Sequence, residues 1–218
     1  MKFSIVVGYW TSHIRQMNII NIFIEHWYIL NNMYLKCQYK RNDLDVDLYP
    51  SLLTPDLATA WYIYLDSIIP KSNNRSSLLF GNEGLIYRVT YRDVTTEREV
   101  IPWSDIPALP ELKSLVDNIT NQTSTVCVIQ RYNDGKVGIN PHRDKEMVFG
   151  TRIAGLSLGA KRTLQLTRAH HEPVSISLPS GSLYVMNPPT NQKWLHSIVK
   201  EPKIKDTRFS LTFRDYRG

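Results

Sequence analysis

The chain has few of the features that mark disulfide-rich, zinc-binding or membrane-spanning proteins. It contains only two cysteines among 218 residues, Cys37 and Cys127, and neither lies in a C-x-x-C pattern. A disulfide framework or a zinc ribbon therefore has no support. The apolar run at residues 17–30 is interrupted by Glu25 and His26 and is too short to span a bilayer. This cysteine usage predicts reduced, intracellular surroundings.

Internal repeats and low-complexity tracts are also absent. Hydrophobic residues make up 42% and charged residues 21% of the chain, which argues against disorder. The length suits one domain with a full hydrophobic core. Residues 1–10 begin with a lysine and a short apolar run, but no small-x-small cleavage site follows, so secretion is not expected. We predict a variable appendage at residues 1–32 and a single domain at 33–218.

Positive charge is concentrated in the second part of the chain. The whole chain carries a net charge of +6, whereas residues 142–218 contain 13 Lys and Arg against 6 Asp and Glu, a net +7. Such an uneven distribution is typical of a protein that contacts phosphates. A solvated basic surface is the alternative.

Residues 54–69 and 111–119 are predicted to form helices. In the first, Thr54 suits the N-cap, and Pro55 suits the first helical position, where its missing N–H costs nothing. Apolar residues recur on one face of that helix at helical spacing, namely Leu57, Trp61, Tyr64, Leu65 and Ile68.

From about residue 124 the sequence changes to short strand-like runs separated by Gly, Pro and Asn. Strands are predicted near residues 125–132, 153–158, 163–167, 174–178, 182–186, 194–199 and 208–214. Several short strands at regular intervals are typical of a sandwich or a barrel-like jelly roll. We therefore predict one α+β, mostly β, domain in which the N-terminal helices cover one face of the β core.

The segment His142-Arg143-Asp144 is the sharpest chemical feature. Residues i and i+2 at a strand or its end point to the same side, so an imidazole and a carboxylate can converge on one ion. His196, in the β-like segment WLHSIV, is the candidate for a third ligand. Two histidines and one carboxylate leave open positions that suit non-haem Fe(II) and oxygen. Taken alone, the pattern is weak evidence, because it also arises by chance and a lone histidine is usually a packed or surface residue.

Residues 208–214 (RFSLTFR) alternate strictly between apolar and polar side chains. Arg208 and Arg214, among small hydroxyl residues, would suit a clamp for a carboxylate ligand, because arginine forms bidentate hydrogen bonds. An outward-facing polar strand is the alternative. Six residues of strand span roughly 20 Å. A small dicarboxylate would therefore reach both arginines only if their side chains lean inward or the strand bends.

Seven motifs occur in order along the chain: FGNEGLIYRVTY, IPWSDIP, VCVIQRYNDGKVGINPHRDKE, IAGLSLGAKRTLQL, PSGSLYVM, WLHSIVK and RFSLTFR. This ordered set, from Phe80 to Arg214, resembles the AlkB family of Fe(II)/2-oxoglutarate dioxygenases. The pattern is closer to the eukaryotic DNA-repair members than to the bacterial founder. The resemblance implies a double-stranded β-helix (jelly roll) core, at about residues 80–215, flanked by helices.

The resemblance also implies how the metal and co-substrate are held. His142, Asp144 and His196 would bind Fe(II). Arg208 would pair with the distal carboxylate of 2-oxoglutarate, and Arg214 would lie near the end of the co-substrate closer to the metal. Together with O2, these are the cofactor and co-substrates that the family uses.

Four further positions match family motifs. Tyr132, in QRYNDG, matches a tyrosine that hydrogen-bonds the co-substrate, and Gln130 stands where the family usually has asparagine. Glu146 matches an acidic residue that recognises an extruded base. Tyr87 matches an aromatic position associated with the flipped nucleotide. Val89 departs from the family pattern, because relatives often carry a second, stacking aromatic there.

The function implied is oxidative dealkylation of nucleic-acid bases, as in repair of 1-methyladenine and 3-methylcytosine in DNA. An RNA demethylase of the same family and a protein-directed oxygenase are alternatives, and a non-catalytic nucleic-acid-binding module is a weaker one. We expect a monomer in the cytoplasm or nucleus that binds nucleic acid and no membrane. Basic residues that could hold flanking phosphates are Lys161, Arg162, Arg168, Lys193, Lys203 and Lys205.

Overall fold

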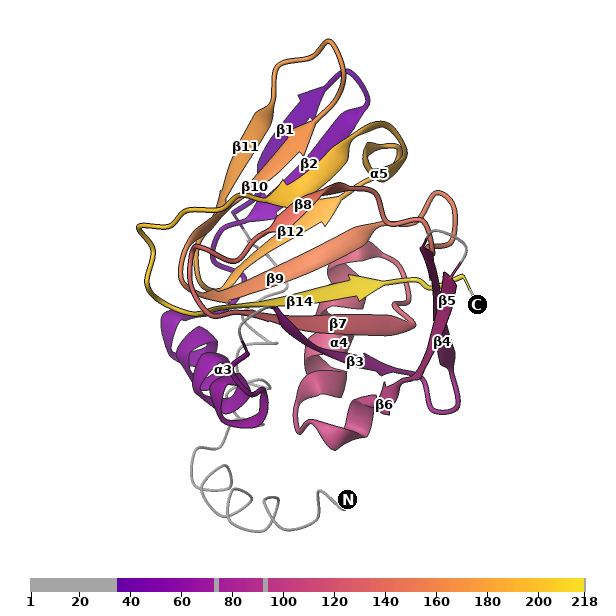
Figure 1. The fold of residues 1–218 in the computed structure, drawn as a ribbon, viewed down its shortest axis with the longest axis vertical. Helices are drawn as coiled ribbons and strands as arrows, with labels where there is room; N and C mark the ends of the chain where they lie inside the picture. The colour runs from indigo at the N-terminus through magenta and orange to yellow at the C-terminus, as the bar shows by residue number, and fades with distance from the viewer. Residues whose placement is uncertain (1–34, 73–74, 92–93, 218) are drawn as a thin grey trace.

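A computed structural model describes residues 35–72, 75–91 and 94–217 of the chain (Figure 1). Within these residues, no helix is long and apolar enough to cross a membrane. The appendage predicted at residues 1–32 lies outside the described residues. The first elements are β1 (Cys37–Arg41), β2 (Leu44–Tyr49), α3 (Pro55–Ile68), β3 (Ser76–Gly81), β4 (Ile86–Tyr91), β5 (Val94–Glu99), β6 (Ile101–Pro102), η1 (Trp103–Asp105) and α4 (Leu109–Thr120).

Eight further strands and one short helix complete the described chain. They are β7 (Val126–Tyr132), β8 (Ile139–His142), β9 (Ile153–Gly159), β10 (Arg162–Thr167), β11 (Val174–Leu178), β12 (Ser182–Met186), α5 (Thr190–Lys193), β13 (Leu195–Ile198) and β14 (Arg208–Arg214). All seven strands predicted from the sequence are present, with ends that differ by no more than a residue or two.

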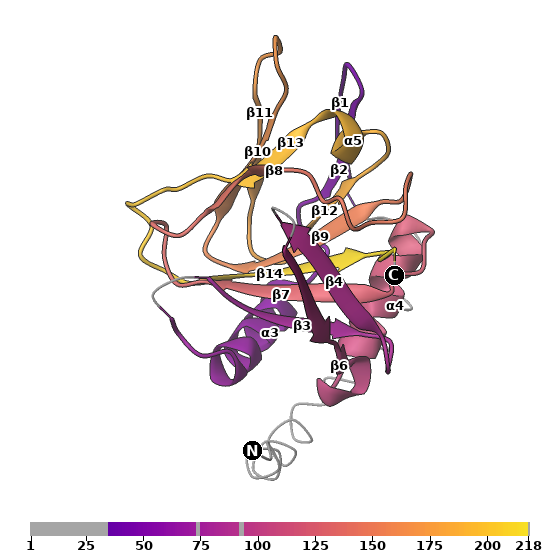
Figure 2. The ribbon, with the colours of Figure 1, turned by 45° about the vertical axis from the view of Figure 1, so that its right-hand side comes forward.

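Strands β7 to β14 form a double-stranded β-helix. The large sheet has the order β1-β2-β12-β9-β14-β7-β3-β6, and the small sheet has the order β11-β10-β13-β8. Along the chain, the strands alternate between two four-stranded sets, β12-β9-β14-β7 and β11-β10-β13-β8, except that β10 and β11 form a hairpin within the small sheet. This arrangement is that of a jelly roll. A separate hairpin, β4-β5, stands beside the open end of the two sheets (Figure 2).

The large sheet separates two hydrophobic cores, and β14 shows why. Phe209, Leu211 and Phe213 pack into the core beneath the helices, while Ser210 and Thr212 face the space between the sheets. The strict alternation in RFSLTFR therefore places an apolar row on one face and a polar row on the other. The polar strand is not solvent-exposed, because all seven residues are buried.

Helices α3 and α4 cover the outer face of the large sheet (Figures 1 and 2). Thr54 caps α3 by accepting a hydrogen bond from the Leu57 amide, and Pro55 is the first helical residue, as predicted. Leu57, Trp61 and Leu65 are buried against the sheet. Both predicted helices are thus confirmed, and α4 extends two residues further toward the N-terminus than expected.

Strands β1 and β2 have no counterpart among the sequence predictions. Strand β2 buries Leu44, Val46 and Leu48 between the sheets, while Asp45 and Asp47 alternate with them. Aspartate is a poor strand former, which weakens the sequence signal. Pairing with β12, at the edge of the jelly roll, stabilises this segment as a strand.

Candidate metal centre and active site

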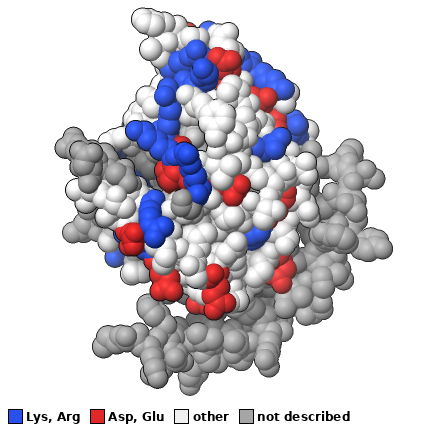
Figure 3. Space-filling model, turned by 90° about the vertical axis from the view of Figure 1, so that its right-hand side faces the viewer, with Lys and Arg blue, Asp and Glu red and all other residues white. Residues whose placement is uncertain are grey.

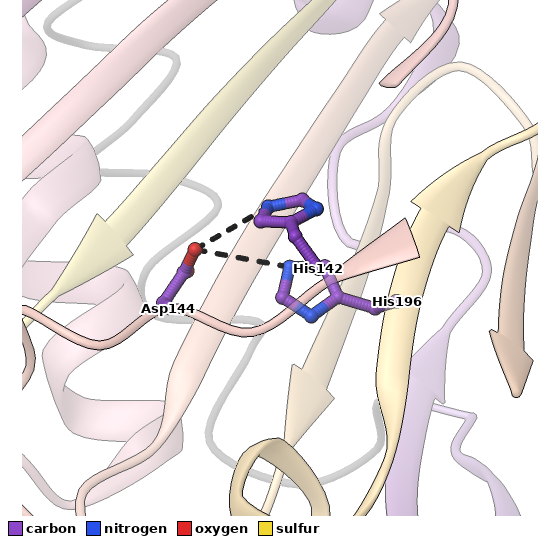
Figure 4. Close-up of side chains that lie close together, drawn as sticks. All are labelled: His142, Asp144 and His196. Carbon is purple, nitrogen blue, oxygen red and sulfur yellow. Dashed lines mark ion pairs between the residues drawn. The ribbon is translucent and has the colours of Figure 1, made fainter. Parts of the chain in front are cut away.

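His142, Asp144 and His196 meet at the open end of the jelly roll (Figure 4). Their candidate ligand atoms all lie within 4.8 Å of one another. Asp144 Oδ1 is 3.4 Å from Nε2 of His142 and 4.0 Å from Nε2 of His196. Two imidazoles and one carboxylate pointing to one spot, with open space beside them, form the donor set that suits non-haem Fe(II). The residues therefore fit the metal that the sequence predicts.

Strand pairing brings the two histidines together. His142 is the last residue of β8, and His196 lies directly opposite it in β13. Side chains at directly opposed positions share one face of the sheet, and the two rings lie 4.2 Å apart between centroids. Asp144 follows two residues after the strand ends and turns toward both rings (Figure 4). The sequence motif supplies two ligands, and the antiparallel pairing supplies the third.

The carboxylate of Asp144 has a different neighbour on each oxygen. Oδ1 faces the two histidines, while Oδ2 pairs with Nη2 of Arg214 at 3.2 Å. Burial raises the pKa of Asp144, but Arg214 and the two histidines outweigh this and hold the pKa well below its ordinary value. The side chain is thus an anion that keeps one oxygen available to a metal.

The two histidines differ in their protonation. Burial lowers the pKa of His196 to about 4, so its ring is neutral near pH 7. Burial also lowers the pKa of His142, but its hydrogen bond and charge interaction with Asp144 outweigh that effect and leave the pKa raised. A neutral imidazole is needed for ligation. Proton competition at the metal centre therefore falls mainly on His142.

This difference predicts how metal affinity depends on pH. Because His142 must lose its proton, affinity for Fe(II) should be constant above its raised pKa and fall about tenfold per pH unit below it. The fall should begin above pH 6.5, the ordinary value for histidine, since the pKa is shifted upward. Anaerobic Fe(II) titrations between pH 5.5 and 8.5 measure this. An affinity that stays constant down to pH 5.5 would contradict the assignment of His142 as a ligand.

Asn191 holds the backbone of Asp144 in place, and this role was not predicted from the sequence. The Asp144 amide donates to Asn191 Oδ1 at 3.0 Å, and Asn191 Nδ2 donates to the Asp144 carbonyl at 2.7 Å. Helix α5, which carries Asn191, is itself tied to β2, because Thr190 Oγ1 both accepts from and donates to the Asp45 backbone. The only available hint was the turn motif NPPTN, which marks a turn and no ligand.

Asn191→Ala should weaken metal binding without unfolding the protein. Removing both hydrogen bonds frees the peptide that carries the Asp144 ligand, and loss of such an outer support typically costs 10–100-fold in metal affinity. Fe(II) affinity of the metal-free protein measures the effect directly. The matched control is Lys193→Ala, which truncates an exposed side chain on the same helix. Equal Fe(II) affinity in the two variants would refute a supporting role for Asn191.

An inner pocket runs from the metal ligands into the space between the sheets. Its lining is mainly polar and includes Gln130, Tyr132, His142, Tyr184, His196, Ser210, Thr212 and Arg214, closed by Ile139, Leu164 and Ile198. A Cβ at Gly155 would overlap the ring of Tyr184, so glycine allows this ring to lie against β9. The Tyr132 hydroxyl donates to Gln130 Oε1 at 2.9 Å. The predicted pair Tyr132 and Gln130 is therefore brought together.

Arg208 lies fully buried beyond the inner pocket, against the ring of Tyr132. Its Nε and Nη2 donate to the hydroxyls of Ser157 and Ser210, and Nη1 has no hydrogen-bond partner. Among the described residues, no carboxylate pairs with this guanidinium. Burial lowers its pKa, which reflects the cost of an uncompensated charge. An anionic carboxylate bound beside Nη1 would supply the missing partner.

Arg208 and Arg214 lie at opposite ends of β14, and in the structure they contact different groups. Arg214 pairs with Asp144 and Glu146 at the metal end of the inner pocket, whereas Arg208 lies six residues away along β14, with Ser157 and Tyr132. One small dicarboxylate does not need to reach both. The two arginines that the sequence suggested as one clamp for a carboxylate ligand therefore occupy two separate positions along β14.

A second, outer pocket of about 370 Å³ opens over the metal ligands. Tyr87 and Val89 of β4 and Arg98 of β5 form one wall, and His142, Asp144 and Glu146 form the floor. Glu146 Oε1 accepts hydrogen bonds from the Tyr87 hydroxyl at 2.7 Å and from Arg214 at 3.3 Å. Tyr216, which the sequence did not single out, packs against Tyr87 with ring centroids 4.7 Å apart.

The prediction that Arg162 contacts phosphates is wrong. Arg162 is buried, and it donates to Glu201 and to the carbonyls of Asp134, Val137 and Val199. Its guanidinium holds neighbouring loops together through these hydrogen bonds, and because it is buried it cannot contact nucleic acid. Arg168 is half-buried and pairs with Asp43. The remaining four candidates are exposed: Lys161, Lys193, Lys203 and Lys205.

Comparison with known proteins agrees with this geometry. A family model described as the 2OG-Fe(II) oxygenase superfamily matches residues 69–214. The chain belongs to this superfamily. The matched residues contain the three metal ligands and both β14 arginines, so the oxygenase carries all five positions that the sequence predicted for Fe(II) and 2-oxoglutarate.

Curated relatives place this oxygenase among AlkB-like members. It is 36% identical to DNA oxidative demethylase ALKBH2 of Bos taurus over 64% of this chain and 52% of the relative. It is 34% identical to ALKBH2 of Homo sapiens, over 64% of this chain and 56% of the relative. Identity to alkB homolog 3 of Rattus norvegicus is 33%, over 57% and 45%. The chain thus spans about half the length of these relatives.

A solved structure supports the architecture. The structure titled "The structure of OsALKBH1" matches with a TM-score of 0.57, covering 83% of this chain and 100% of the other. The two sequences are 12% identical. The likeness shows a shared fold, which confirms the prediction of a jelly roll flanked by helices.

Proposed function

We propose that this oxygenase removes alkyl groups from the bases of DNA, using Fe(II), 2-oxoglutarate and O2. The observation that carries the proposal is the outer pocket, which is lined by the Glu146 carboxylate and the Tyr87 ring together with the metal ligands His142 and Asp144. A base in this pocket would present its alkylated edge to the metal. The names of the ALKBH2 relatives support DNA as the substrate.

The inner pocket offers distinct partners for 2-oxoglutarate. Arg208 Nη1 is a buried donor without a hydrogen-bond partner, so it would bind the distal carboxylate of 2-oxoglutarate. The Tyr132 hydroxyl and the Gln130 amide lie between Arg208 and the metal end and would add hydrogen bonds. Arg214 would hold Asp144 in its ligating orientation and raise the positive potential near the metal end.

Glu146 would select among bases by hydrogen bonding. Its Oε1 is fixed by Tyr87 and Arg214, and its Oε2 accepts from the Lys145 amide at 2.9 Å. An ionised carboxylate only accepts hydrogen bonds, so it matches the exocyclic amino groups of adenine and cytosine. The carbonyl oxygens of guanine and thymine at the same position would face repulsion. Lesions of the 1-methyladenine and 3-methylcytosine type are therefore the favoured substrates.

The bound metal and co-substrate would supply the oxidation of the carbon attached to the base nitrogen, after which that carbon leaves as an aldehyde. The protein would supply placement. The base must leave its stack to enter the outer pocket, as in other enzymes that act on bases. The β4-β5 hairpin, on one side of this pocket, would enclose it.

Formaldehyde release tests the proposal. Matched DNA and RNA oligonucleotides carrying 1-methyladenine or 3-methylcytosine are incubated with the protein, with and without Fe(II) and 2-oxoglutarate. We expect release that requires both additions and is faster on DNA than on RNA. Faster release from RNA would instead identify an RNA demethylase.

Other outcomes separate the remaining alternatives. Intact Fe(II) and 2-oxoglutarate binding without release from any oligonucleotide would point to another substrate, such as a protein side chain. Failure to bind either would indicate a non-catalytic nucleic-acid-binding module. The three ligands and both arginines argue against the last possibility, because a module without catalysis would not need to retain them.

The setting proposed for this activity follows from the same features. We propose a single domain at residues 33–218 that acts as a monomer on nucleic acid, in the cytoplasm or nucleus and away from membranes. Support comes from the unpaired cysteines, one exposed and one buried, and from relatives named for DNA demethylation. The metal ligands all come from one chain, so the site requires no second copy.

A further inference from the structure

Phe149 is the most exposed large hydrophobic residue of the described chain. Its side chain is 85% exposed, and its neighbour Val148 is 37% exposed. A single exposed hydrophobic residue is common and requires no function by itself. Three further observations about this position, its turn, its charged surroundings and its distance from the outer pocket, give it a specific meaning.

The first observation is that the backbone holds Phe149 outward. The Thr151 amide and hydroxyl both bond to the Val148 carbonyl, which closes a four-residue turn with Phe149 and Gly150 at its centre. Gly150 has φ of +79°, as the third residue of a type II turn requires. The side chain of Phe149 is therefore displayed at the tip of a hydrogen-bonded turn.

The second observation is that this turn continues the segment that carries the active-site carboxylates. Met147 pairs with Tyr216, the Val148 amide donates to the Asp215 carbonyl, and the Arg217 amide donates to the Glu146 carbonyl. These bonds fix the turn relative to the floor of the outer pocket. Phe149 follows Glu146 by three residues, which limits the separation along the chain to at most roughly 10 Å.

The third observation is the charge around the turn. Arg143, Lys145 and Arg217 are exposed, and none of them forms an ion pair with another described residue, although Arg143 Nη2 donates a hydrogen bond to the Lys193 carbonyl at 3.3 Å. Figure 3 shows Lys and Arg side chains gathered beside a hollow on the face that carries the β4-β5 hairpin and the C-terminus. Unpaired cations beside an exposed aromatic ring are the combination with which proteins bind a nucleic-acid strand.

We propose that Phe149 stacks on a base that neighbours the target base on the same DNA strand, while Arg143, Lys145 and Arg217 contact the flanking phosphates. Stacked bases are 3.4 Å apart along one strand, so roughly 10 Å corresponds to a base within about three positions of the target. Stacking there would hold the strand while the target base occupies the outer pocket. The inference rests on the proposed function for its choice of DNA as partner.

Binding of an unmodified DNA strand tests the inference apart from catalysis. The probe is a fluorescein-labelled 12-nucleotide single strand, and its Kd is measured by anisotropy for wild type, Phe149→Ala and Phe149→Trp. Loss of one stacked base should raise the Kd of Phe149→Ala about tenfold. Phe149→Trp keeps an aromatic face and should bind as wild type does. The matched control is Ile63→Ala, a 52% exposed apolar residue on α3, which should change nothing.

A second readout reports stacking itself. In an oligonucleotide with 2-aminopurine at the first, second or third position beside 1-methyladenine, at least one probe should be quenched on binding wild type but not Phe149→Ala. Turnover of 2-oxoglutarate without DNA should be the same in both proteins, because Phe149 lines neither pocket.

The outcomes separate this inference from the proposed function. Wild-type affinity in Phe149→Ala, equal losses in the Ala and Trp variants, or no binding of DNA by wild type would each overturn the stacking role. If wild type binds the strand but never releases formaldehyde, the proposed function fails. The ratio of Kd values then still decides the role of Phe149.

Discussion

Asp144→Ala should lose Fe(II) binding and all formaldehyde release. The variant removes one of the three candidate ligands found among the described residues, and Asp144 is the only anion of these three. The loss should exceed the roughly 10–100-fold expected for an outer support such as Asn191. The Asp144 carboxylate lies beside both imidazoles and supplies the negative charge that attracts a cation to this position. Its removal makes the electrostatic potential there less favourable for a cation. Anaerobic Fe(II) titration and the formaldehyde assay measure the two losses.

Stability must be measured beside binding, because Asp144 also neutralises Arg214. Removing one partner of a buried ion pair costs about 3–5 kcal/mol, but Glu146 still pairs with this guanidinium and reduces the cost. Asp144→Asn keeps the shape and should lose iron with a smaller change in Tm. Asp206→Ala, an exposed carboxylate elsewhere, should match wild type in both assays. Full activity of Asp144→Asn would show that the metal centre is assigned wrongly.

The metal centre shows which kinds of site a sequence can predict. Spacing alone placed His142 and Asp144 together, because i and i+2 geometry is local. The third ligand depends on β13 pairing with β8, which joins residues 54 positions apart and leaves no mark in local spacing. The role of Asn191 is harder still to predict from the sequence. Its side chain hydrogen-bonds to a backbone peptide, and a peptide of any residue type could make the same bonds. The β-like segment WLHSIV made His196 a candidate, the family resemblance supported it, and only the fold identified Asn191.

The net charge of a sequence segment does not distinguish buried from exposed residues. The basic excess after residue 142 includes Arg162, Arg208 and Arg214, and all three are buried. Arg162 donates to backbone carbonyl groups within the fold, while Arg214 lines both pockets and Arg208 packs against Tyr132 of the inner pocket. The cations that remain on the surface include Lys145 and Arg217, which are close in sequence to the pocket residues Glu146 and Arg214 and were not among the residues predicted to contact phosphates. Part of the positive charge in the second half of the chain is therefore buried inside the protein.

Arg208→Met should raise the Kd for 2-oxoglutarate by two to three orders of magnitude without destabilising the protein. Truncating one partner of a buried, hydrogen-bonded charge pair costs about 2–5 kcal/mol, and each 1.4 kcal/mol is about tenfold. In the absence of co-substrate, however, the guanidinium is buried without a carboxylate partner. Replacing buried charged groups with apolar side chains of similar size is often neutral or stabilising. Binding and stability should therefore change in opposite directions.

Thermal unfolding with Fe(II) under anaerobic conditions measures both effects in one experiment. Saturating 2-oxoglutarate should raise the Tm of wild type, because a ligand at 100 times its Kd adds about 2.7 kcal/mol. The Tm of Arg208→Met should equal or exceed that of ligand-free wild type and should not respond to the same concentration. Arg208→Lys keeps the charge but not the planar fork, so its response should be intermediate. If Arg208→Met instead unfolds at a much lower temperature, the hydrogen bonds to Ser157 and Ser210 make Arg208 a structural residue, and the distal carboxylate must bind elsewhere.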